Sequence, residues 1–558
     1  MEYASRPWIK NYPKRLKEFI DQGPYSTENY IEIVNDVTEK FSSNPAFSMV
    51  LPDGKYKSLS FEQIDDYSNK LASYLKNTLK LSKGDVVGIQ LANCPHYPII
   101  TFAAWKIGAI VTNINPLYTL RESEHQLQDS ATKVLFLLEQ TLGNFEKIIE
   151  LNAQLAHIQL VTVSLKDFFI PTNSSIESID FHDRKPHQPE SFIEILSRHD
   201  ALNKNEYINH EVAVYQYTGG TTGKSKGAII THKNILSFVQ NCNEYVKSYG
   251  FGFNEQDTVL TAIPMYHVIA FCGNFLLFYS EGTHNVLVPS PKPIDNLRPA
   301  FSSFKISWIT GVETLFSALL NTTWFKDEAK YMRCCISGGA ALRPITLEAW
   351  KNIISPIYEA FGMTEIASVA TMHPLISELK KSSVGIPLPF YEIKIVNDKN
   401  QEVPIGHEGE LCVKGPQLMQ SYLNTPENPF IEGWFHTGDI AKMDQDGYIY
   451  ILDRKKDMVI VSGFNVYPNE IEAVLGNHPH IQDVAVIGIP DDKTGESLLA
   501  YIVPSNDSLT IENVISFCQE HLTAYKVPKK FELRLDLPKT TVGKIMRNQL
   551  KQAVANNS

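Results

Sequence analysis

The stretch YTGGTTGKSKGAIITHKN, from Tyr217 to Asn234, sets a loop of glycine, threonine and lysine between two segments that predict β-strands. VAVYQY precedes the loop and GAII follows it, ahead of a helix expected from about Lys233. A Walker phosphate loop opens directly into a helix and needs a glycine where this sequence has Thr218. The strand–loop–strand pattern therefore excludes a P-loop NTPase and predicts a loop joining two strands.

The residues of the loop can bind an oxyanion. Its glycines let backbone N–H groups come close, its hydroxyls donate, and its lysines, with Lys226 just beyond, neutralise charge. A glycine–threonine hairpin without a ligand is the alternative that the loop alone leaves open. The candidate phosphate-binding residues are Tyr217, Thr218, Gly219, Gly220, Thr221, Thr222, Gly223 and Lys224.

Length and composition set the broad class. A chain of 558 residues is too long for one ordinary core, so two or more domains are expected. The net charge of −11 argues against a nucleic-acid footprint. Seven cysteines, an odd number with no C-x-x-C pair, indicate neither a disulfide framework nor a zinc site. With no signal-peptide pattern at the start, these features predict a cytoplasmic protein.

The order of patterns predicts an α/β fold with a largely parallel sheet. Apolar runs at 85–91, 109–112 and 133–138 indicate buried strands, and Ser60 with Gln63 predicts a capped helix. The long apolar stretch 97–114 contains Lys106 and Gly108, which favours a buried helix and strand over a membrane span. After about residue 380 short strands predict a β-rich subdomain, followed by a compact α+β domain.

Six further stretches carry a joint signal: IPMYHVIAF (263–271), SGGAAL (337–342), YEAFGMTE (358–365), GWFHTGDI (433–440), DRKKDMVIVSGFNVYPNEIE (453–472) and LPKTTVGKIMR (537–547). In this order and spacing they resemble the adenylate-forming superfamily of acyl-CoA synthetases, adenylation domains and luciferases. With NPLYTLRESEHQL and LTAYKVPK, the pattern is similar to bacterial long-chain fatty-acid–CoA ligases, over nearly the whole chain.

The resemblance implies a reaction in two halves: a carboxylate attacks the α-phosphate of ATP to give an acyl-adenylate, and coenzyme A then displaces AMP. Lys544 matches the lysine that bridges the carboxylate and the α-phosphate. Glu365 matches the glutamate associated with Mg²⁺, a cation that suits one carboxylate plus phosphates. Thr364 is expected to donate to the α-phosphate and His267 to position the acyl carboxylate. Alone, each would be an ordinary surface or core residue.

The resemblance also implies the nucleotide contacts. Asp439 is expected to accept hydrogen bonds from the ribose hydroxyls, with Arg454 assisting, as acidic residues do in dinucleotide sites. Phe361 stands where the family usually has tyrosine, so stacking on adenine is kept and a phenol hydroxyl is lost. The remaining expected nucleotide contacts are Gly338, Gly339, Ala340, Gly362 and Met363.

One site must serve both half-reactions, and the family achieves this by rotating the small domain. Lys456 matches the hinge position, which predicts a large domain over 1–452, a hinge at 453–457 and a C-terminal lid domain over 458–558. Ser462 and Gly463 are then expected to line the pantetheine path.

An acyl tunnel is implied as well. Phe271 occupies the place of a gating tryptophan in some long-chain enzymes, while Gly311 and Val312 match the tunnel wall. Each buried methylene is worth about 0.8 kcal/mol, so tunnel length selects chain length.

Three rival functions remain open from the sequence. The same machinery serves medium-chain or aryl acids, an adenylate donor would pass its product to a carrier protein, and a regulatory protein would bind ATP without chemistry. Because long-chain relatives work at membranes and some form dimers, a peripheral contact with the inner face of the membrane and a homodimer are further expectations. No residue pattern encodes either property.

Overall fold

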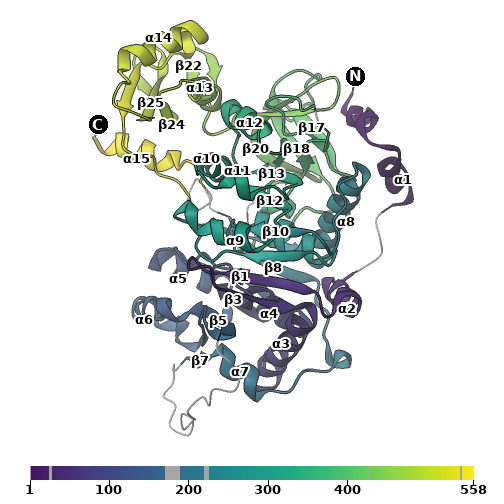
Figure 1. Cartoon of the computed structure of the whole chain (residues 1–558). Coiled ribbons are helices and arrows are strands. Elements are labelled where there is room, and N and C mark those ends of the chain that lie inside the picture. The colour runs from purple at the N-terminus through teal and green to yellow at the C-terminus, as the bar shows by residue number, and fades with distance from the viewer. Residues whose placement is uncertain are drawn as a thin grey trace.

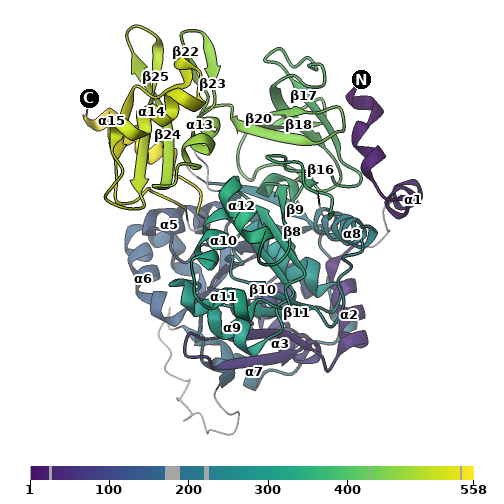
Figure 2. The same ribbon diagram turned by 45° about the horizontal axis from the view of Figure 1, so that its top comes forward.

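The computed structural model describes residues 2–23, 28–169, 189–218, 225–376, 378–426, 428–540 and 543–557. A large N-terminal domain of several sheets carries a smaller C-terminal domain at one end, drawn in yellow-green in Figures 1 and 2. The predicted α/β class is confirmed.

A seven-stranded sheet contains the strands predicted at 85–91, 109–112 and 133–138, which lie near its centre. It also contains the two strands that flank the phosphate loop. Among its described pairs, β8–β9 is antiparallel and the others are parallel. The strand–loop–strand prediction is thus confirmed at the edge of the sheet. The order is β7 (Glu190–Ser191), β6 (Gln159–Val163), β5 (Thr132–Leu138), β3 (Val86–Gln90), β4 (Ile110–Asn113), β8 (Val212–Thr218) and β9 (Lys226–Thr231).

Two helices of this half were predicted from the sequence, and both are confirmed. Ser60 and Gln63 form the expected capping box at the start of α3 (Phe61–Ser73). Every residue of α4 (His96–Lys106) is buried, and Lys106 pairs with Asp65 at 2.6 Å, which explains a lysine in an apolar run. Within the described residues, no helix combines the length and apolarity needed to cross a membrane. The other helices are α1 (Lys14–Gln22), α2 (Tyr30–Phe41), α5 (Leu120–Asp129), α6 (Leu142–Leu151) and α7 (Phe192–Arg198).

A nine-stranded sheet positions most of the motifs. Its parallel central strands end at one edge, so the segments that follow β10, β12, β13 and β14 converge there, as in other α/β sites. The order is β16 (Ile386–Pro387), β15 (Thr371–Met372), β14 (Ile357–Phe361), β13 (Cys334–Gly338), β12 (Trp308–Gly311), β10 (Thr258–Thr261), β11 (His284–Leu287), β1 (Pro45–Val50) and β2 (Tyr56–Ser60). Its helices are α8 (His232–Ser248), the π-helical η9 (Ile269–Leu277), α9 (Arg298–Ser303), α10 (Glu313–Leu320), α11 (Phe325–Glu328) and α12 (Pro344–Lys351).

The predicted β-rich subdomain is a five-stranded sheet, and the C-terminal domain has a hydrophobic core of its own. The first comprises β17 (Glu392–Val396), β18 (Gly409–Lys414), β19 (Phe430–Ile431), β20 (Trp434–Met443) and β21 (Ile449–Arg454). The second comprises β22 (Val459–Val461), β23 (Phe464–Val466), α13 (Pro468–Leu475), β24 (Ile481–Asp491), β25 (Gly495–Pro504), α14 (Ile511–His521), β26 (Lys530–Leu533) and α15 (Arg547–Asn557).

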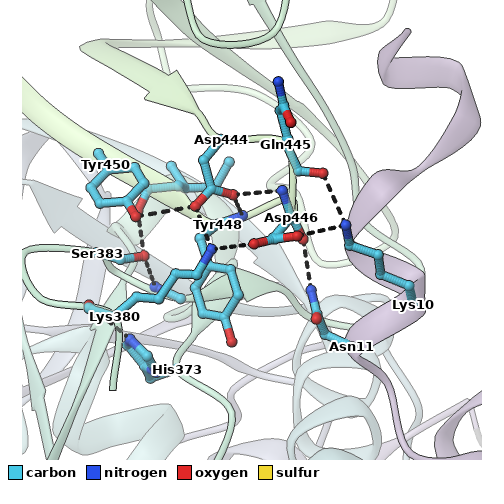
Figure 3. A network of polar contacts seen from close by, with 12 residues as sticks. Lys10, Asn11, His373, Lys380, Ser383, Asp444, Gln445, Asp446, Tyr448 and Tyr450 are labelled. Atoms are coloured by element: carbon cyan, nitrogen blue, oxygen red, sulfur yellow. Dashed lines mark hydrogen bonds and ion pairs between the residues drawn. The ribbon is translucent and has the colours of Figure 1, made fainter. Parts of the chain in front are cut away.

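The N-terminal segment, which the sequence patterns did not place, fastens onto the β-rich sheet (Figure 3). Lys10 pairs with Asp446 at 2.6 Å, and Lys380 bridges Asp444 and Asp446 from the other side. A Cβ on Gly447 would lie 2.5 Å from the backbone of Trp8, so only glycine permits this approach. The segment also pairs with α8 through Arg15 and Glu244 at 3.1 Å, so it links this sheet to the rest of the large domain.

Candidate active site

Lys544 reaches from the C-terminal domain to the edge of the nine-stranded sheet. A Cβ on Gly339 would lie 3.5 Å from its Cε atom, and its charge interacts with Asp439, Glu365 and Arg454. Burial of the ammonium group lowers the pKa of Lys544, Arg454 lowers it further, and the two carboxylates oppose this. The structure thus brings together the four charged residues that the resemblance placed at the reaction centre.

The turn before Lys544 is fitted to the large domain. Gly543 has φ of +80°, and a Cβ there would approach Thr314 Oγ1 to 2.6 Å. Beside it, Arg343 donates from Nε to Glu313 at 2.7 Å and from Nη1 to the carbonyl of Gln482, in the C-terminal domain, at 3.1 Å. The small domain is therefore docked against the large domain with Lys544 beside Gly339.

Asp439 has the features of a ligand-binding carboxylate. It lies opposite Arg454 across β20 and β21 and is 3% exposed, with Oδ1 2.9 Å from the guanidinium Nε. Burial raises the pKa of Asp439 to about 6, against the opposing effect of Arg454. Its Oδ2 atom is buried and has no hydrogen-bond partner among the described residues. A buried acceptor needs a donor, and the hydroxyls of a ribose would supply it.

Glu365 and Thr364 lie in the short turn that follows β14. Glu365 is 7% exposed, and its Oε1 atom accepts a hydrogen bond of 2.7 Å from the hydroxyl of Tyr422, a residue that sequence reasoning missed. The described residues contain no group of three or more His, Cys, Asp or Glu side chains arranged for a metal. A Mg²⁺ ion at Glu365 would accordingly share this single carboxylate with nucleotide phosphates, which is the usual arrangement for that cation.

His267 follows β10 in the turn before η9. Burial lowers the pKa of His267 to about 4, and the charge of Lys544 lowers it further. The imidazole is therefore neutral at pH 7, which suits a positioning role beside a carboxylate nucleophile that needs no base.

The predicted adenine-face residues lie at the ends of β13 and β14. Gly339 has φ of +87°, which favours glycine, and a Cβ on Gly362 would collide with the carbonyl of Ser368. Gly362 therefore has no room for a side chain, whereas at Gly339 the left-handed backbone disfavours one. Ala340 and Met363 follow directly in these two loops, and Phe361 ends β14.

A narrow apolar cavity of about 40 Å³ runs inward from these loops, between the sheet, η9 and α8. Gly338, Gly339 and Gly362 line its near end. The rest of its wall is Phe238, Cys242, Val246, Phe253, Ile269, Gly273, Leu277, Phe278, Thr310, Ile336, Ala360, Ser368, Val369 and Met372.

The three tunnel residues named from the sequence lie elsewhere than on this wall. Phe271 is fully buried in an aromatic cluster with Tyr97, Trp105 and Phe275. Gly311 packs beneath Phe316, whose ring would lie 2.8 Å from an added Cβ. Val312 is buried beside Gly339. Their assignment to an acyl tunnel remains a prediction, whereas the cavity is built from η9, α8 and the strand ends.

Part of the phosphate loop, Gly219 to Lys224, lies outside the described residues. Of the flanking residues, Thr218 ends β8, and Tyr217 donates its hydroxyl to Asp129 Oδ2 at 2.6 Å, so this phenol is engaged within the fold. Lys226 begins β9, with its ammonium 5.4 Å from the centre of the Tyr422 ring.

The residues expected at the hinge and along the coenzyme A path lie on the C-terminal side of β21. Lys456 is exposed in the turn between β21 and β22, next to the fully buried Asp453. Ser462 and Gly463 form the exposed turn between β22 and β23, and no atom lies within 4 Å of a Cβ added to Gly463. No residue of either turn is among those that line the cavity.

Comparison with known proteins places this geometry in a family. Residues 35–423 match the AMP-binding enzyme family, and residues 470–544 match the AMP-binding enzyme C-terminal domain. The chain belongs to the AMP-binding enzyme family.

The individual relatives share one type of activity. The chain is 36% identical to a long-chain-fatty-acid–CoA ligase of Escherichia coli O6:H1, over 98% of this chain and 97% of the relative. It is 31% identical to a long-chain-fatty-acid–CoA ligase of Bacillus subtilis, over 99% of both. Among solved structures it resembles the anthranilate CoA ligase AuaEII in complex with anthranoyl-AMP, with a TM-score of 0.84 and 25% identity, covering 97% of this chain and 99% of that one. It also resembles o-succinylbenzoate CoA synthetase of Bacillus subtilis with ATP and magnesium, with a TM-score of 0.76 and 26% identity, covering 93% and 99%.

Proposed function

We propose that this protein is a long-chain fatty acid–CoA ligase, which converts ATP, a fatty acid and coenzyme A to acyl-CoA, AMP and pyrophosphate. It is an AMP-forming acid–thiol ligase. The observation that carries the proposal is the position of the Lys544 side chain. It lies against Gly339, which also lines the apolar cavity. A cationic group at the near end of an apolar cavity suits a molecule with an anionic head and an apolar tail.

In the first half-reaction, the carboxylate oxygen attacks the α-phosphorus and pyrophosphate leaves. Both reactants are anionic, so the chain must supply positive charge where they meet, and Lys544 would do so from a partly buried position. Neutral His267 orients the carboxylate, and Thr364 donates to the α-phosphate. Asp439 and Arg454 hold the ribose, and the glycine–threonine loop clamps the β- and γ-phosphates. Glu365 would hold Mg²⁺, which supplies charge neutralisation on the phosphates.

In the second half-reaction, the thiol of coenzyme A attacks the acyl carbon and AMP leaves. We infer that residues 458–558 turn about a hinge at 453–457, with Lys456 as the pivot, relative to the large domain 1–452. Lys544 would then leave the site, and the Ser462–Gly463 turn would enter it beside the pantetheine arm. The separate hydrophobic core of the C-terminal domain supports movement as one body.

The full-length likeness to long-chain ligases favours an alkyl chain over an aryl acid. The apolar wall suits such a tail, each methylene of which gains about 0.8 kcal/mol on burial. The product would feed the class of reactions that degrade fatty acyl thioesters or build lipids from them. Cytoplasmic location, peripheral contact with the inner face of the membrane and a homodimer remain predictions.

A ladder of saturated acids from six to eighteen carbons tests the substrate. AMP release is measured at fixed ATP and Mg²⁺, with and without coenzyme A, and an aryl acid is added as a comparison. We expect turnover that depends on coenzyme A and peaks between fourteen and eighteen carbons. A peak on short or aryl acids would contradict the long-chain assignment, and turnover that ignores coenzyme A would favour an adenylate donor.

A further inference from the structure

Tyr422 belongs to none of the sequence motifs of the candidate site. Its hydroxyl nevertheless donates a 2.7 Å hydrogen bond to Glu365 Oε1, 57 positions away in the sequence. We propose that Tyr422 is a positioning residue that fixes the Glu365 carboxylate for a divalent cation bound with the nucleotide. The inference rests on the proposed function, because it takes Glu365 as the cation ligand.

The hydrogen bond distinguishes the two oxygens of Glu365. Oε1 accepts from the phenol, which leaves Oε2 the less engaged oxygen for binding a cation. A glutamate side chain has several rotatable bonds, and a fixed donor on one oxygen removes much of that freedom before the ligand arrives. Partners behind a metal-binding carboxylate commonly orient it in this way.

Backbone hydrogen bonds fix the segment around Tyr422 on two sides. Met419 donates its N–H to the carbonyl of Glu365 at 2.8 Å, which ties the segment to the turn after β14. On its other side the segment adds to β9: Leu423 N–H donates to Gly227 at 2.7 Å, and Gln420 N–H donates to Ile229 at 2.9 Å. Tyr422 is therefore held between the glutamate and the strand that follows the phosphate loop.

The same segment reaches the strand that precedes the loop. Asn424 donates to the backbone carbonyl of Asp129 at 2.8 Å, and the carboxylate of Asp129 accepts from Tyr217. The Tyr422 ring also faces the Lys226 ammonium at 5.4 Å, a cation–π distance. One tyrosine thus touches two groups of opposite charge, Glu365 through its hydroxyl and Lys226 through its ring.

A positioning role and a merely structural role predict different losses. If the hydrogen bond only stabilises the fold, its removal lowers the melting temperature and leaves the metal dependence of ATP binding unchanged. If it positions Glu365, its removal weakens the metal-dependent part of ATP binding and spares the rest.

The test is Tyr422→Phe, which keeps the ring over Lys226 and removes the hydroxyl. ATP binding is measured by calorimetry in Mg²⁺ and again in EDTA, and Mn²⁺ binding in the presence of ATP is followed by electron paramagnetic resonance. We expect the metal-dependent gain in ATP affinity and the Mn²⁺ affinity to fall about tenfold, with ATP binding in EDTA unchanged. The matched control is Tyr450→Phe, since that hydroxyl donates to Asp444 at 3.1 Å in the β-rich sheet and should affect neither.

A double-mutant cycle shows whether Tyr422 acts through Glu365. In a Glu365→Gln background the metal-dependent gain is already lost, so Tyr422→Phe should cause no further loss. An equal loss in both backgrounds, a loss that persists in EDTA, or unchanged metal affinity in Tyr422→Phe would each overturn the proposal. These experiments need no acyl substrate. A wild-type protein that binds ATP without any metal dependence would instead count against the proposed function.

Discussion

Lys544→Ala is expected to abolish adenylate formation, with a loss of roughly a thousandfold or more, while thioester formation from supplied acyl-adenylate stays within a few-fold of wild type. The ammonium lies beside Gly339 and interacts with the charges of Asp439 and Glu365, where the two anionic reactants would meet in the proposed reaction. In the thioester-forming arrangement the lysine would lie outside the site, so its loss should not matter there.

The two half-reactions are measured separately, as pyrophosphate release with ATP and fatty acid, and as acyl-CoA formation from synthetic acyl-adenylate. Lys529→Ala is a matched control, because this lysine belongs to the same domain and pairs with Asp491 at 2.9 Å, in a surface ion pair that should matter to neither step. Equal losses in both half-reactions of Lys544→Ala would refute the alternation of domains.

Gly463→Leu is expected to give the opposite split: coenzyme A turnover falls by about a hundredfold or more, and pyrophosphate release is spared. Gly463 has φ of +85°, and a Cβ added there meets no atom within 4 Å in the docked arrangement. When the domain turns, the added side chain would occupy the path of the pantetheine arm. The direct readout is acyl-CoA formation from supplied acyl-adenylate.

The left-handed backbone at Gly463 requires its own control, because any side chain there costs about 1–2 kcal/mol of strain. Gly406 has φ of +94°, also with nothing within 4 Å, and lies in the β-rich part of the large domain. Gly406→Leu should therefore carry the strain without blocking either step. Normal coenzyme A turnover in Gly463→Leu would remove Gly463 from the pantetheine path.

The sequence predicted those features that local pattern determines. The runs at 85–91, 109–112 and 133–138 are strongly apolar and became β3, β4 and β5. The capping box at Ser60 has a fixed spacing and formed as expected. Segments that follow neighbouring parallel strands lie at the same edge of a sheet. Glu365 follows β14 and Gly339 follows β13, so the topology of the sheet places both at that edge.

The remaining features depend on contacts that no local pattern records. Tyr422 is 57 positions from Glu365, and its neighbours QSYLN give no periodic signal. The run IAFCGNFLL is apolar on every side, so its sequence did not indicate that Phe271 would face the core while Ile269, Gly273 and Leu277 face the cavity. The contact of Trp8 with Gly447 likewise joins residues that are far apart in the sequence, so no local pattern predicts it.

Oxygen transfer tests the central claim, that an acyl-adenylate forms at this site. A C16 fatty acid labelled with ¹⁸O in its carboxylate is incubated with ATP, Mg²⁺ and coenzyme A, and the products are analysed by mass spectrometry. Attack of the carboxylate on the α-phosphorus, followed by thiolysis, leaves one labelled oxygen in the phosphate of AMP and none in pyrophosphate. Label in orthophosphate with formation of ADP, or unlabelled AMP, would contradict the account.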